Sequence, residues 1–385
     1  MRAVVWHGKN DVRVDDVDDP TIEEPTDAII RVTSTAICGS DLHLYTKLWP
    51  VMEEGDILGH EAMGVVMEVG SEVTHLEPGD RVVVPFNVSC GWCLQCQERM
   101  YSQCETTQNT SMRKAASLIG YTKLYGHIPG AQAEYLRVPQ AQFGPIKVPD
   151  DAPELRFVLL ADVLPTAWQA VDYAGVKEGD TVSVHGLGPI GQMAARIALF
   201  RGAGRVIGVD RVPERLEMAA RHGVETIDFG DVPDATEAIA ELTRGTLCHA
   251  AIDAVGMEAS GSLRDSVLQA TKVQPDKLAA LHSALGSVRR GGTLSIAGVY
   301  SGPFPLFPLG DLFDKQITVR MGQANVKRWI DDILPLIAGD DDPLGVDDLV
   351  THRMPIDQAP YAYEIFQKKM DGCVKVVLEP GAVSP

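Results

Sequence analysis

Short apolar runs, each bounded by glycine or charged residues, recur through the middle of the chain. They read TVSVHG at 181–186, RVIGVD at 205–210, AAIDAVG at 250–256, GTLSIAGVY at 292–300 and ITVRMG at 317–322. Segments with helical periodicity follow the first two runs, at 189–198 and at 214–223 (ERLEMAARHG). Strand-length runs that alternate with helices predict an α/β fold with a doubly wound parallel sheet of the Rossmann type.

A glycine-rich turn follows the first of these predicted strands. Gly186, Gly188 and Gly191 have the spacing G-x-G-x-x-G, and a turn of this kind between a strand and a helix receives the pyrophosphate of a dinucleotide. Pro189 suits the first turn of the helix. The alternative interpretation is an ordinary glycine-rich turn in an α/β domain.

An acidic residue ends the second predicted strand. Asp210 lies 19 residues beyond Gly191, where a carboxylate binds the ribose hydroxyls of the adenosine. Because a carboxylate repels a 2′-phosphate, the pattern favours NAD over NADP, while the adjacent Arg211 leaves NADP open as an alternative.

Composition narrows the classes of partner. Apolar residues at 45% and charged residues at 23% exclude a disordered or fibrous chain. Acidic residues outnumber basic ones 53 to 34, and the formal charge of −19 repels nucleic acid and anionic membrane surfaces, so neither is an expected partner. Charged residues come too early for a signal peptide, and no run of about 18 apolar residues occurs. We expect a cytoplasmic protein.

Four of the seven cysteines stand close together in an irregular stretch. They are Cys90, Cys93, Cys96 and Cys104, with the spacing C-x2-C-x2-C-x7-C. In a reducing compartment cysteines serve metals rather than disulfides, and four thiolates complete a tetrahedral zinc shell with no open position. The spacing predicts a structural zinc, with a disulfide cluster or incidental buried cysteines as the alternatives. Cys248 and Cys373 lie outside the metal motifs and are assigned to packing.

Two further segments suit a second metal. TAICGSDLH surrounds Cys38 and LGHEAMGVV surrounds His60. A catalytic zinc takes three protein ligands and keeps one position open, and a cysteine, a histidine and a carboxylate satisfy that need. Taken singly, Cys38 also fits a buried small residue and His60 a hydrogen-bonded core histidine. The residues alone do not select the third ligand.

The motifs CGSDLH, GHE and HGLGPIG, with the four-cysteine loop, together resemble the zinc-containing medium-chain dehydrogenase/reductase (alcohol dehydrogenase-like) superfamily over essentially the whole chain. The run DVRVDDVDDPTIEEPTDAIIRVTSTAICGSDLHLY and the segment ADVLPTAW are most similar to the formaldehyde dehydrogenase branch. This resemblance implies Asp162, in the second segment, as the third ligand of a catalytic zinc with Cys38 and His60. It also implies a mainly β GroES-like catalytic domain beside the Rossmann domain.

Further roles follow from the same resemblance. Glu61 is implied as a group beside the metal or an exchangeable ligand, and Asp41 as the residue that orients His60. Ser40 and His43 are implied as a proton relay from the alcohol toward solvent, with hydride passing to the nicotinamide. For His43 the alternative is a polar residue that simply faces water. The expected cofactor-binding residues are Gly186, Gly188, Pro189, Ile190, Gly191, Asp210, Arg211, Arg215, Val255, Gly298, Val299 and Gln323.

The expected domains are a catalytic domain of residues 1–162 and 325–385, which holds both zinc sites, and an NAD-binding domain of residues 163–324. The stretch between the runs at 250–256 and 292–300 is longer than a crossover requires. Residues 258–276 are interpreted as an insertion that covers the adenine end of NAD, or as a solvated excursion.

The resemblance implies a homo-oligomer, either a dimer or a tetramer. The run GTLSIAGVY is interpreted as an apolar edge strand that forms the contact between subunits or, alternatively, as a buried central strand.

The leading functional prediction is oxidation of a small alcohol or hydrated aldehyde with NAD by an enzyme that holds about two zinc ions per chain. A polyol, sugar or amino-alcohol dehydrogenase is the enzymatic alternative. A non-catalytic NAD- or zinc-binding protein is the alternative of another class, against which the intact ligand and relay set argues. Three aromatic residues are candidates to narrow the pocket, namely Trp49, Phe86 and Trp92.

Overall fold

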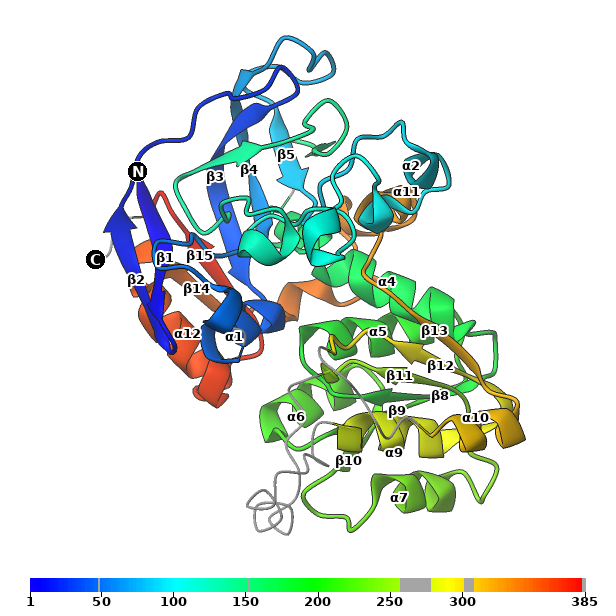
Figure 1. Cartoon of the computed structure of the whole chain (residues 1–385). Coiled ribbons are helices and arrows are strands. Elements are labelled where there is room, and N and C mark those ends of the chain that lie inside the picture. Colours follow the sequence, from blue (N-terminus) through cyan, green and yellow to red (C-terminus); the bar gives the residue numbers. More distant parts are fainter. Residues whose placement is uncertain (48, 151–152, 257–277, 301–307, 383–385) are drawn as a thin grey trace. The chain divides into compact units, whose positions relative to one another are not determined.

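The computed structural model describes residues 1–47, 49–150, 153–256, 278–300 and 308–382 (Figure 1). The chain forms two compact units. Unit 1 consists of Met1–Pro165 and Ala324–Pro385, and unit 2 consists of Thr166–Gln323. The expected insertion at 258–276 lies outside the described residues.

Unit 1 is built on a seven-stranded sheet and a separate two-stranded hairpin. The hairpin consists of β1 (Arg2–Gly8) and β2 (Asp11–Asp16). The sheet has the order β14-β15-β3-β4-β5-β7, with β6 also paired to β3. Its strands are β3 (Ala28–Ile37), β4 (Glu61–Val69), β5 (Arg81–Val84), β6 (Tyr135–Val138), β7 (Ile146–Lys147), β14 (His352–Pro355) and β15 (Val376–Glu379).

The end of the chain returns to the sheet that the beginning starts. β15 pairs antiparallel with β3, and β14 lies beyond it. The helices of unit 1 are α1 (Gly39–Thr46), α2 (Leu94–Gln97), α3 (Glu154–Val158), α11 (Ile330–Ile337) and α12 (Ala359–Lys368), whereas α4 (Val163–Ala174) begins in unit 1 and continues into unit 2. Tyr363 and Phe366 of α12 pack into one core with Ile37, Leu44 and Leu58, so apolar burial joins the two ends of the chain.

Short 3₁₀ helices occupy many of the connections. They are η1 (Trp49–Val51), η2 (Tyr101–Gln103), η3 (Thr110–Met112), η4 (Thr122–Tyr125), η5 (Leu159–Ala161), η9 (Val326–Arg328), η10 (Val346–Asp348) and η11 (Ile356–Gln358).

Unit 2 contains a six-stranded parallel sheet with the order β10-β9-β8-β11-β12-β13. The strands are β8 (Thr181–His185), β9 (Arg205–Asp210), β10 (Glu225–Asp228), β11 (Cys248–Asp253), β12 (Val288–Ile296) and β13 (Thr318–Met321). The helices are α5 (Pro189–Phe200), α6 (Pro213–Arg221), α7 (Ala235–Leu242), α9 (Ala279–Ser287) and α10 (Leu309–Lys315). With α5 on one face and α7 and α9 on the other (Figure 1), the predicted doubly wound sheet is confirmed.

Of the two interpretations of the run GTLSIAGVY, the buried central strand is confirmed and the apolar edge strand is wrong. β12, which contains most of the run GTLSIAGVY, lies between β11 and β13 and is therefore an inner strand. Leu294 and Ile296 of this run are buried. The edge strand is β13, so the apolar character of β12 reflects burial on both faces of a parallel sheet rather than an exposed edge.

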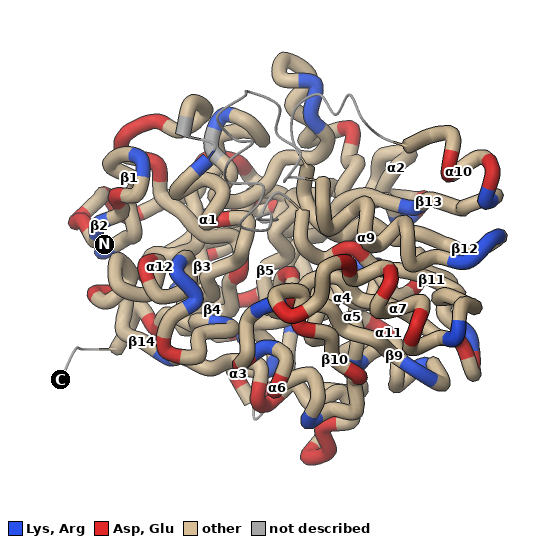
Figure 2. Tube along the Cα trace, turned by 90° about the horizontal axis from the view of Figure 1, so that it is seen from below, with Lys and Arg blue, Asp and Glu red and all other residues tan. Residues whose placement is uncertain are grey.

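Acidic positions are spread over many segments, with basic positions among them (Figure 2), as the net charge of −19 leads one to expect. Among the described residues, every helix falls short of the length and apolarity that a membrane crossing requires.

Cys248 and Cys373 are both buried within apolar clusters, which confirms their assignment to packing.

Candidate metal centre and nucleotide site

Two antiparallel strands, β3 and β4, bring the first pair of predicted zinc ligands together. β3 ends one residue before Cys38, and β4 begins one residue after His60. Ala36 pairs with Glu61 across these strands, so Cys38 and His60 lie at the same end of the sheet. The sheet register, rather than proximity in the sequence, creates this part of the site.

Asp162 completes the set from the residue that follows η5. Its Oδ2 lies 3.3 Å from Cys38 Sγ and 3.4 Å from His60 Nε2. Ligand bonds of about 2.0–2.3 Å place neighbouring ligands of a tetrahedral zinc ion about 3.3–3.8 Å apart. The ligand atoms of these three residues and of Glu61 all lie within 4.8 Å of one another. The donor set and its spacing therefore fit Zn²⁺.

Asp41 orients the histidine of this set. It is fully buried, and its Oδ1 lies 3.0 Å from His60 Nδ1, while its Oδ2 accepts hydrogen bonds from the Cys38 amide at 2.9 Å and from Gln132 at 3.4 Å. A carboxylate on Nδ1 leaves Nε2 as the metal-binding nitrogen.

The electrostatics of the pocket favour a cation at this nitrogen. Burial lowers the pKa of His60, but the carboxylates of Asp41 and Asp162 outweigh it and raise this pKa well above its usual value. Burial and the charge of Asp162 raise the pKa of the Cys38 thiol. A buried pocket that contains a thiol and carboxylates favours a positive charge, and a bound metal ion would supply one.

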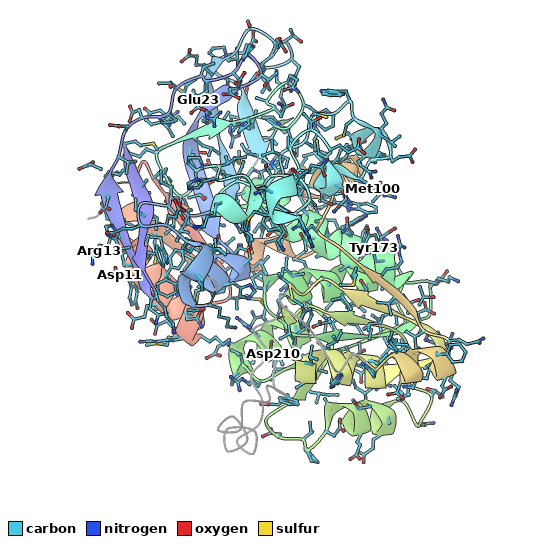
Figure 3. All side chains as sticks on the ribbon, in the orientation of Figure 1. Asp11, Arg13, Glu23, Met100, Tyr173 and Asp210 are labelled. Atoms are coloured by element: carbon cyan, nitrogen blue, oxygen red, sulfur yellow. The ribbon has the colours of Figure 1, made fainter. Side chains whose placement is uncertain are left out.

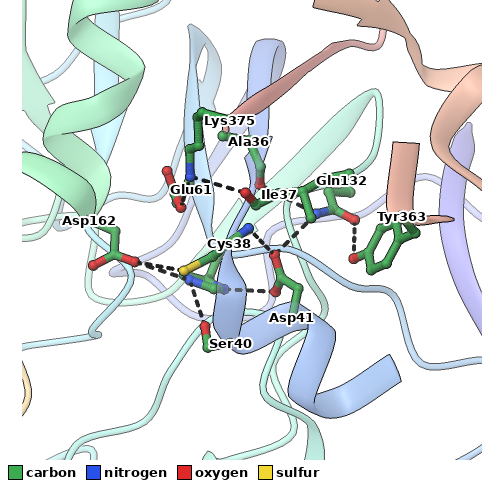
Figure 4. A network of polar contacts seen from close by, with 11 residues as sticks. Ala36, Ile37, Cys38, Ser40, Asp41, Glu61, Gln132, Asp162, Tyr363 and Lys375 are labelled. Carbon is green, nitrogen blue, oxygen red and sulfur yellow. Dashed lines mark hydrogen bonds and ion pairs between the residues drawn. The ribbon is translucent and has the colours of Figure 1, made fainter. Parts of the chain in front are cut away.

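The C-terminal strand adds a residue that sequence reasoning missed. Val376 pairs with Ile37, which brings Lys375 beside the ligand cluster (Figure 4). Its Nζ donates to Glu61 Oε1 at 2.5 Å and to the Ile37 carbonyl at 3.1 Å, and the Lys375 and Glu61 side chains are fully buried. A lysine inside the apolar run CVKVV signals a buried charge, but it does not identify the partner.

Glu61 keeps one oxygen available beside the metal set. Within the described part of the chain, its Oε2 is buried without a hydrogen-bond partner. Because a buried acceptor is costly when it has no partner, this oxygen supports the interpretation of Glu61 as an exchangeable ligand.

The predicted proton relay lies on α1. Ser40 and His43 are three residues apart and are neighbours on the helix surface. Ser40 Oγ lies 3.4 Å from His60 Nε2, and it also hydrogen-bonds with the phenol of Tyr121. His43 is only 4% exposed, so the alternative in which it faces water is wrong. Transfer from Ser40 to His43 stays a prediction.

Aromatic rings pack against the candidate metal ligand. The centroids of Phe86 and Tyr121 lie 6.0 Å and 5.7 Å from that of the His60 ring, both edge-on. Tyr121 was not found by sequence reasoning. Trp92 is 62% exposed in the cysteine loop, so the expectation that it narrows the pocket is not supported. The side chain of Trp49 lies outside the described part of the chain.

The four-cysteine loop forms a second compact donor set. All four thiols are free and buried, with Sγ separations of 3.9 Å from Cys90 to Cys96 and from Cys93 to Cys104. Bonds of about 2.3 Å place the sulfurs of a tetrahedral zinc–thiolate site about 3.8 Å apart. The loop therefore fits a zinc ion whose shell is filled by the protein.

Backbone amides around these sulfurs favour thiolates. The amides of Cys93 and Glu105 lie 3.4 Å from the sulfurs of Cys90 and Cys93, respectively. Burial raises the pKa of Cys93, but amide hydrogen bonds outweigh it and lower this pKa to about 6. At Cys96 the effect of burial is the larger one and raises the pKa of the thiol. Thiolate character is what a zinc ligand requires.

The glycine turn of unit 2 has the geometry that its spacing predicts. Gly186 has φ +87°, a left-handed conformation that glycine adopts without strain. Gly188 is the N-cap of α5, with Pro189 and Ile190 in its first turn. A Cβ on Gly191 would come within 1.7 Å of the Gly186 carbonyl oxygen. These glycines allow the helix N-terminus to approach the strand closely, as dinucleotide sites require.

Asp210, at the end of β9 (Figure 3), is tied to this turn. Its Oδ2 accepts a hydrogen bond from the Leu187 amide at 2.7 Å, and its Oδ1 accepts one from Arg211 at 2.7 Å. Arg211 is exposed, whereas the Arg215 guanidinium lies 3.8 Å from Asp210. The carboxylate of Asp210 and the guanidinium of Arg215 thus lie at the same turn, and Arg211 contributes its backbone amide.

The remaining expected cofactor residues follow the other strands. Val255 follows β11, Gly298 and Val299 follow β12, and Gln323 follows β13. Carboxyl ends of parallel strands meet at one edge of a sheet, and ligands of doubly wound sheets bind there. Val255 also packs against the glycine turn, since a Cβ on Gly186 would meet its side chain at 2.6 Å.

Comparisons with known proteins agree with this site. Residues 24–150 match the family described as alcohol dehydrogenase GroES-like domain, and residues 189–274 match the zinc-binding dehydrogenase family. An uncharacterized zinc-type alcohol dehydrogenase-like protein, AdhB, from Bacillus subtilis strain 168 is 44% identical over 99% of this chain and 100% of its own. The formaldehyde dismutase of Pseudomonas putida is 34% identical over 98% of this chain and 97% of its own.

A solved structure of similar fold is the alcohol dehydrogenase TADH from Thermus sp. ATN1, with a TM-score of 0.83 and 36% identity over 98% of this chain and 99% of that chain. The fold and the matches define an oxidoreductase of the zinc-dependent alcohol dehydrogenase type. The chain belongs to the zinc-type alcohol dehydrogenase family, within the medium-chain dehydrogenase/reductase superfamily.

Proposed function

We propose that this oxidoreductase transfers hydride between NAD and a small alcohol or aldehyde, with formaldehyde-related chemistry as the nearest analogy. The observation that carries the proposal is the convergence of Cys38, His60 and Asp162, whose ligand atoms lie within 4.8 Å of one another. Three protein ligands leave one position of a tetrahedral zinc ion open for a substrate, as a catalytic site requires.

The proposed division of labour follows the two units. Residues 1–162 and 325–385 form the catalytic domain, and residues 163–324 bind NAD. Support comes from the location of both donor sets in unit 1 and of the glycine turn in unit 2. The shell of the Cys90–Cys104 loop is complete without substrate, so its zinc stabilises the fold.

The side chains around the catalytic set have distinct tasks. A zinc ion bound there supplies Lewis acidity that makes a substrate hydroxyl more acidic. Asp41 keeps His60 in the orientation that presents Nε2, from which Ser40 Oγ lies 3.4 Å away. Ser40 accepts the substrate proton, and His43 passes it on along the same helix. A nicotinamide dinucleotide bound at the glycine turn of unit 2 would supply the hydride acceptor.

A small substrate is supported by the packing around His60. The rings of Phe86 and Tyr121 lie against its imidazole, and rigid aromatic walls limit the space beside a ligand. The formaldehyde dismutase of P. putida is similar over nearly the whole chain. A polyol or amino alcohol is recognised through several hydrogen bonds, so the substrate panel described below distinguishes this alternative from a small substrate.

NAD is the proposed cofactor because Asp210 stands beside the glycine turn. Its carboxylate binds ribose hydroxyls and repels a 2′-phosphate. The positive charges of Arg211, next to Asp210 in the sequence, and of Arg215 lessen this repulsion. The size of the preference for NAD over NADP is therefore measured by kinetics with both nucleotides.

A homo-oligomer is also proposed, through the edge strand β13 rather than through β12. Large apolar side chains near this edge are exposed: Leu309 by 68%, Phe313 by 84% and Met321 by 61%. Apolar surface beside an open strand edge is typical of self-association. The molar mass of the purified protein in solution tests this directly, and a monomer contradicts it.

The test of the main proposal is NADH formation with formaldehyde, ethanol, benzyl alcohol, sorbitol and threonine. We expect the small substrates to react fastest and Cys38→Ser to abolish activity, while the control Cys373→Ala retains it. Faster oxidation of sorbitol or threonine supports the polyol or amino-alcohol alternative. If no NADH forms, aldehyde alone is added and paired alcohol and acid are measured. Absence of both products contradicts hydride transfer.

A further inference from the structure

One buried carboxylate joins two of the loops at the carboxyl edge of the unit 2 sheet. Asp253, the last residue of β11, is fully buried. Its carbonyl oxygen accepts hydrogen bonds from the amides of Ala297 and Gly298, both at 2.9 Å. Its side chain accepts from the Val255 amide at 3.0 Å and from the Tyr300 hydroxyl at 2.5 Å. Residues 254–256, the described part of the loop after β11, are thereby fastened to residues 297–300, the described part of the loop after β12.

These loops are packed without spare room. A Cβ added to Gly298 would come 2.3 Å from the Gly256 amide nitrogen, and a Cβ on Gly256 would come 2.5 Å from the Val299 amide nitrogen. Backbone contacts this close leave little freedom for either loop to shift alone. The hydrogen bond between Asp253 and Tyr300 adds a side-chain link between two loops that backbone contacts already hold close together.

The order of the strands indicates which half of a bound dinucleotide would lie over these loops. β9, which ends at Asp210, lies on one side of β8 and its glycine turn, and β11 and β12 lie on the other side. A dinucleotide that places its adenosine at the acid and its pyrophosphate at the turn extends its nicotinamide half over β11 and β12.

We propose that Asp253 and Tyr300 are positioning residues that hold the loops after β11 and β12 in the shape that receives the nicotinamide half of the cofactor. The inference rests on the proposed function, since it requires a nicotinamide dinucleotide at this edge. Neither residue was among the expected cofactor-binding residues, because neither belongs to a sequence motif that is known to bind nucleotides.

The test compares two ligands that share only the adenosine half. Tyr300→Phe removes one hydroxyl and keeps the ring, so it weakens a bond to a charged acceptor without opening a large cavity. We expect the Kd for NADH, measured by fluorescence titration, to rise about five- to twentyfold. The Kd for 5′-AMP, measured by calorimetry, should change less than about twofold, and KM for the aldehyde should stay the same.

Matched variants separate positioning from general stability. Tyr173→Phe removes a hydroxyl from a ring of the same unit that stacks on Arg320, 4.1 Å away, and should change neither Kd. Asp253→Asn keeps the side-chain volume and should show the same split between NADH and 5′-AMP as Tyr300→Phe. Thermal unfolding without nucleotide shows that each variant is folded before titration.

The outcomes are distinguishable. If the wild-type protein binds neither NADH nor 5′-AMP, the proposed function itself is wrong. If the wild type binds both and Tyr300→Phe weakens both equally, or weakens neither, the positioning role is overturned.

Discussion

Lys375 donates a hydrogen bond from Nζ to Oε1 of Glu61 at 2.5 Å, although 314 positions separate the two residues in the sequence. Both side chains are completely buried. Glu61 adds a carboxylate to a buried cluster that already contains Asp41 and Asp162. The ammonium therefore balances part of the negative charge that the candidate metal site concentrates.

Removal of this ammonium should destabilise the protein strongly. Lys375→Met leaves the Glu61 carboxylate buried without its cation, so we expect the free energy of unfolding to fall by about 3–5 kcal/mol. Adding Glu61→Gln should restore much of the loss. Urea unfolding of the metal-loaded protein measures the change. The control is Lys368→Met, which breaks the exposed pair with Glu364 and should change the stability far less than Lys375→Met. Equal losses for the two lysine variants contradict the interpretation.

Metal content should respond differently to loss of a ligand from each donor set. The wild-type protein should hold about two zinc ions per chain, and Cys38→Ser and Cys104→Ser should each hold about one. Cys104→Ser should also lower the thermal unfolding midpoint, because its zinc closes a loop, whereas Cys38→Ser should mainly lose activity. Atomic absorption and calorimetry measure both effects, with Cys248→Ala as the control. Two zinc ions retained in Cys38→Ser contradict the assigned ligand set.

Cofactor preference should change when the acid beside the glycine turn is neutralised. Asp210→Asn keeps the size of the side chain but removes the charge that repels a 2′-phosphate. We expect the ratio of kcat/KM for NAD to that for NADP to fall at least about tenfold, which corresponds to about 1.4 kcal/mol. Steady-state kinetics with both nucleotides checks this, and Asp228→Asn, at the end of β10, is the control. An unchanged ratio removes Asp210 from the specificity site.

Stability should fall in mild acid because of a histidine in the core of unit 2. Burial lowers the pKa of His185 to about 4, whereas an unfolded histidine titrates near about 6.5. Between pH values of about 4 and about 6.5, the unfolded state therefore binds a proton that the folded state does not bind. The contribution is complete above about pH 6.5 and is lost as the pH falls to about 4, at a cost of about 3 kcal/mol.

The measurement is urea unfolding of wild type and His185→Gln at pH 7.5 and pH 4.5. Only the wild type should show this part of the loss, so the difference between the two proteins should narrow or reverse at the lower pH. A difference that is the same at both pH values shows that His185 does not titrate in this range.

Features that depend on local spacing could be predicted from the residues alone. The four cysteines fall within one short loop, so their spacing already indicates one donor set. The glycine turn and Asp210 belong to consecutive elements of one βαβ unit, and the alternation of apolar runs with helices predicted the parallel sheet. Cys38 and His60 could be proposed as ligands, but the choice of Asp162 came from family resemblance and not from the residues themselves.

The tertiary structure alone decided which distant residues meet. Pairing of β15 with β3 placed Lys375 beside Glu61, and the order of the parallel strands made β12 an inner strand and brought Tyr300 to Asp253. Sequence periodicity shows which face of an element is apolar, but strand order and register come from burial summed over the whole sheet. That sum depends on partners far along the chain, so no local pattern contains it.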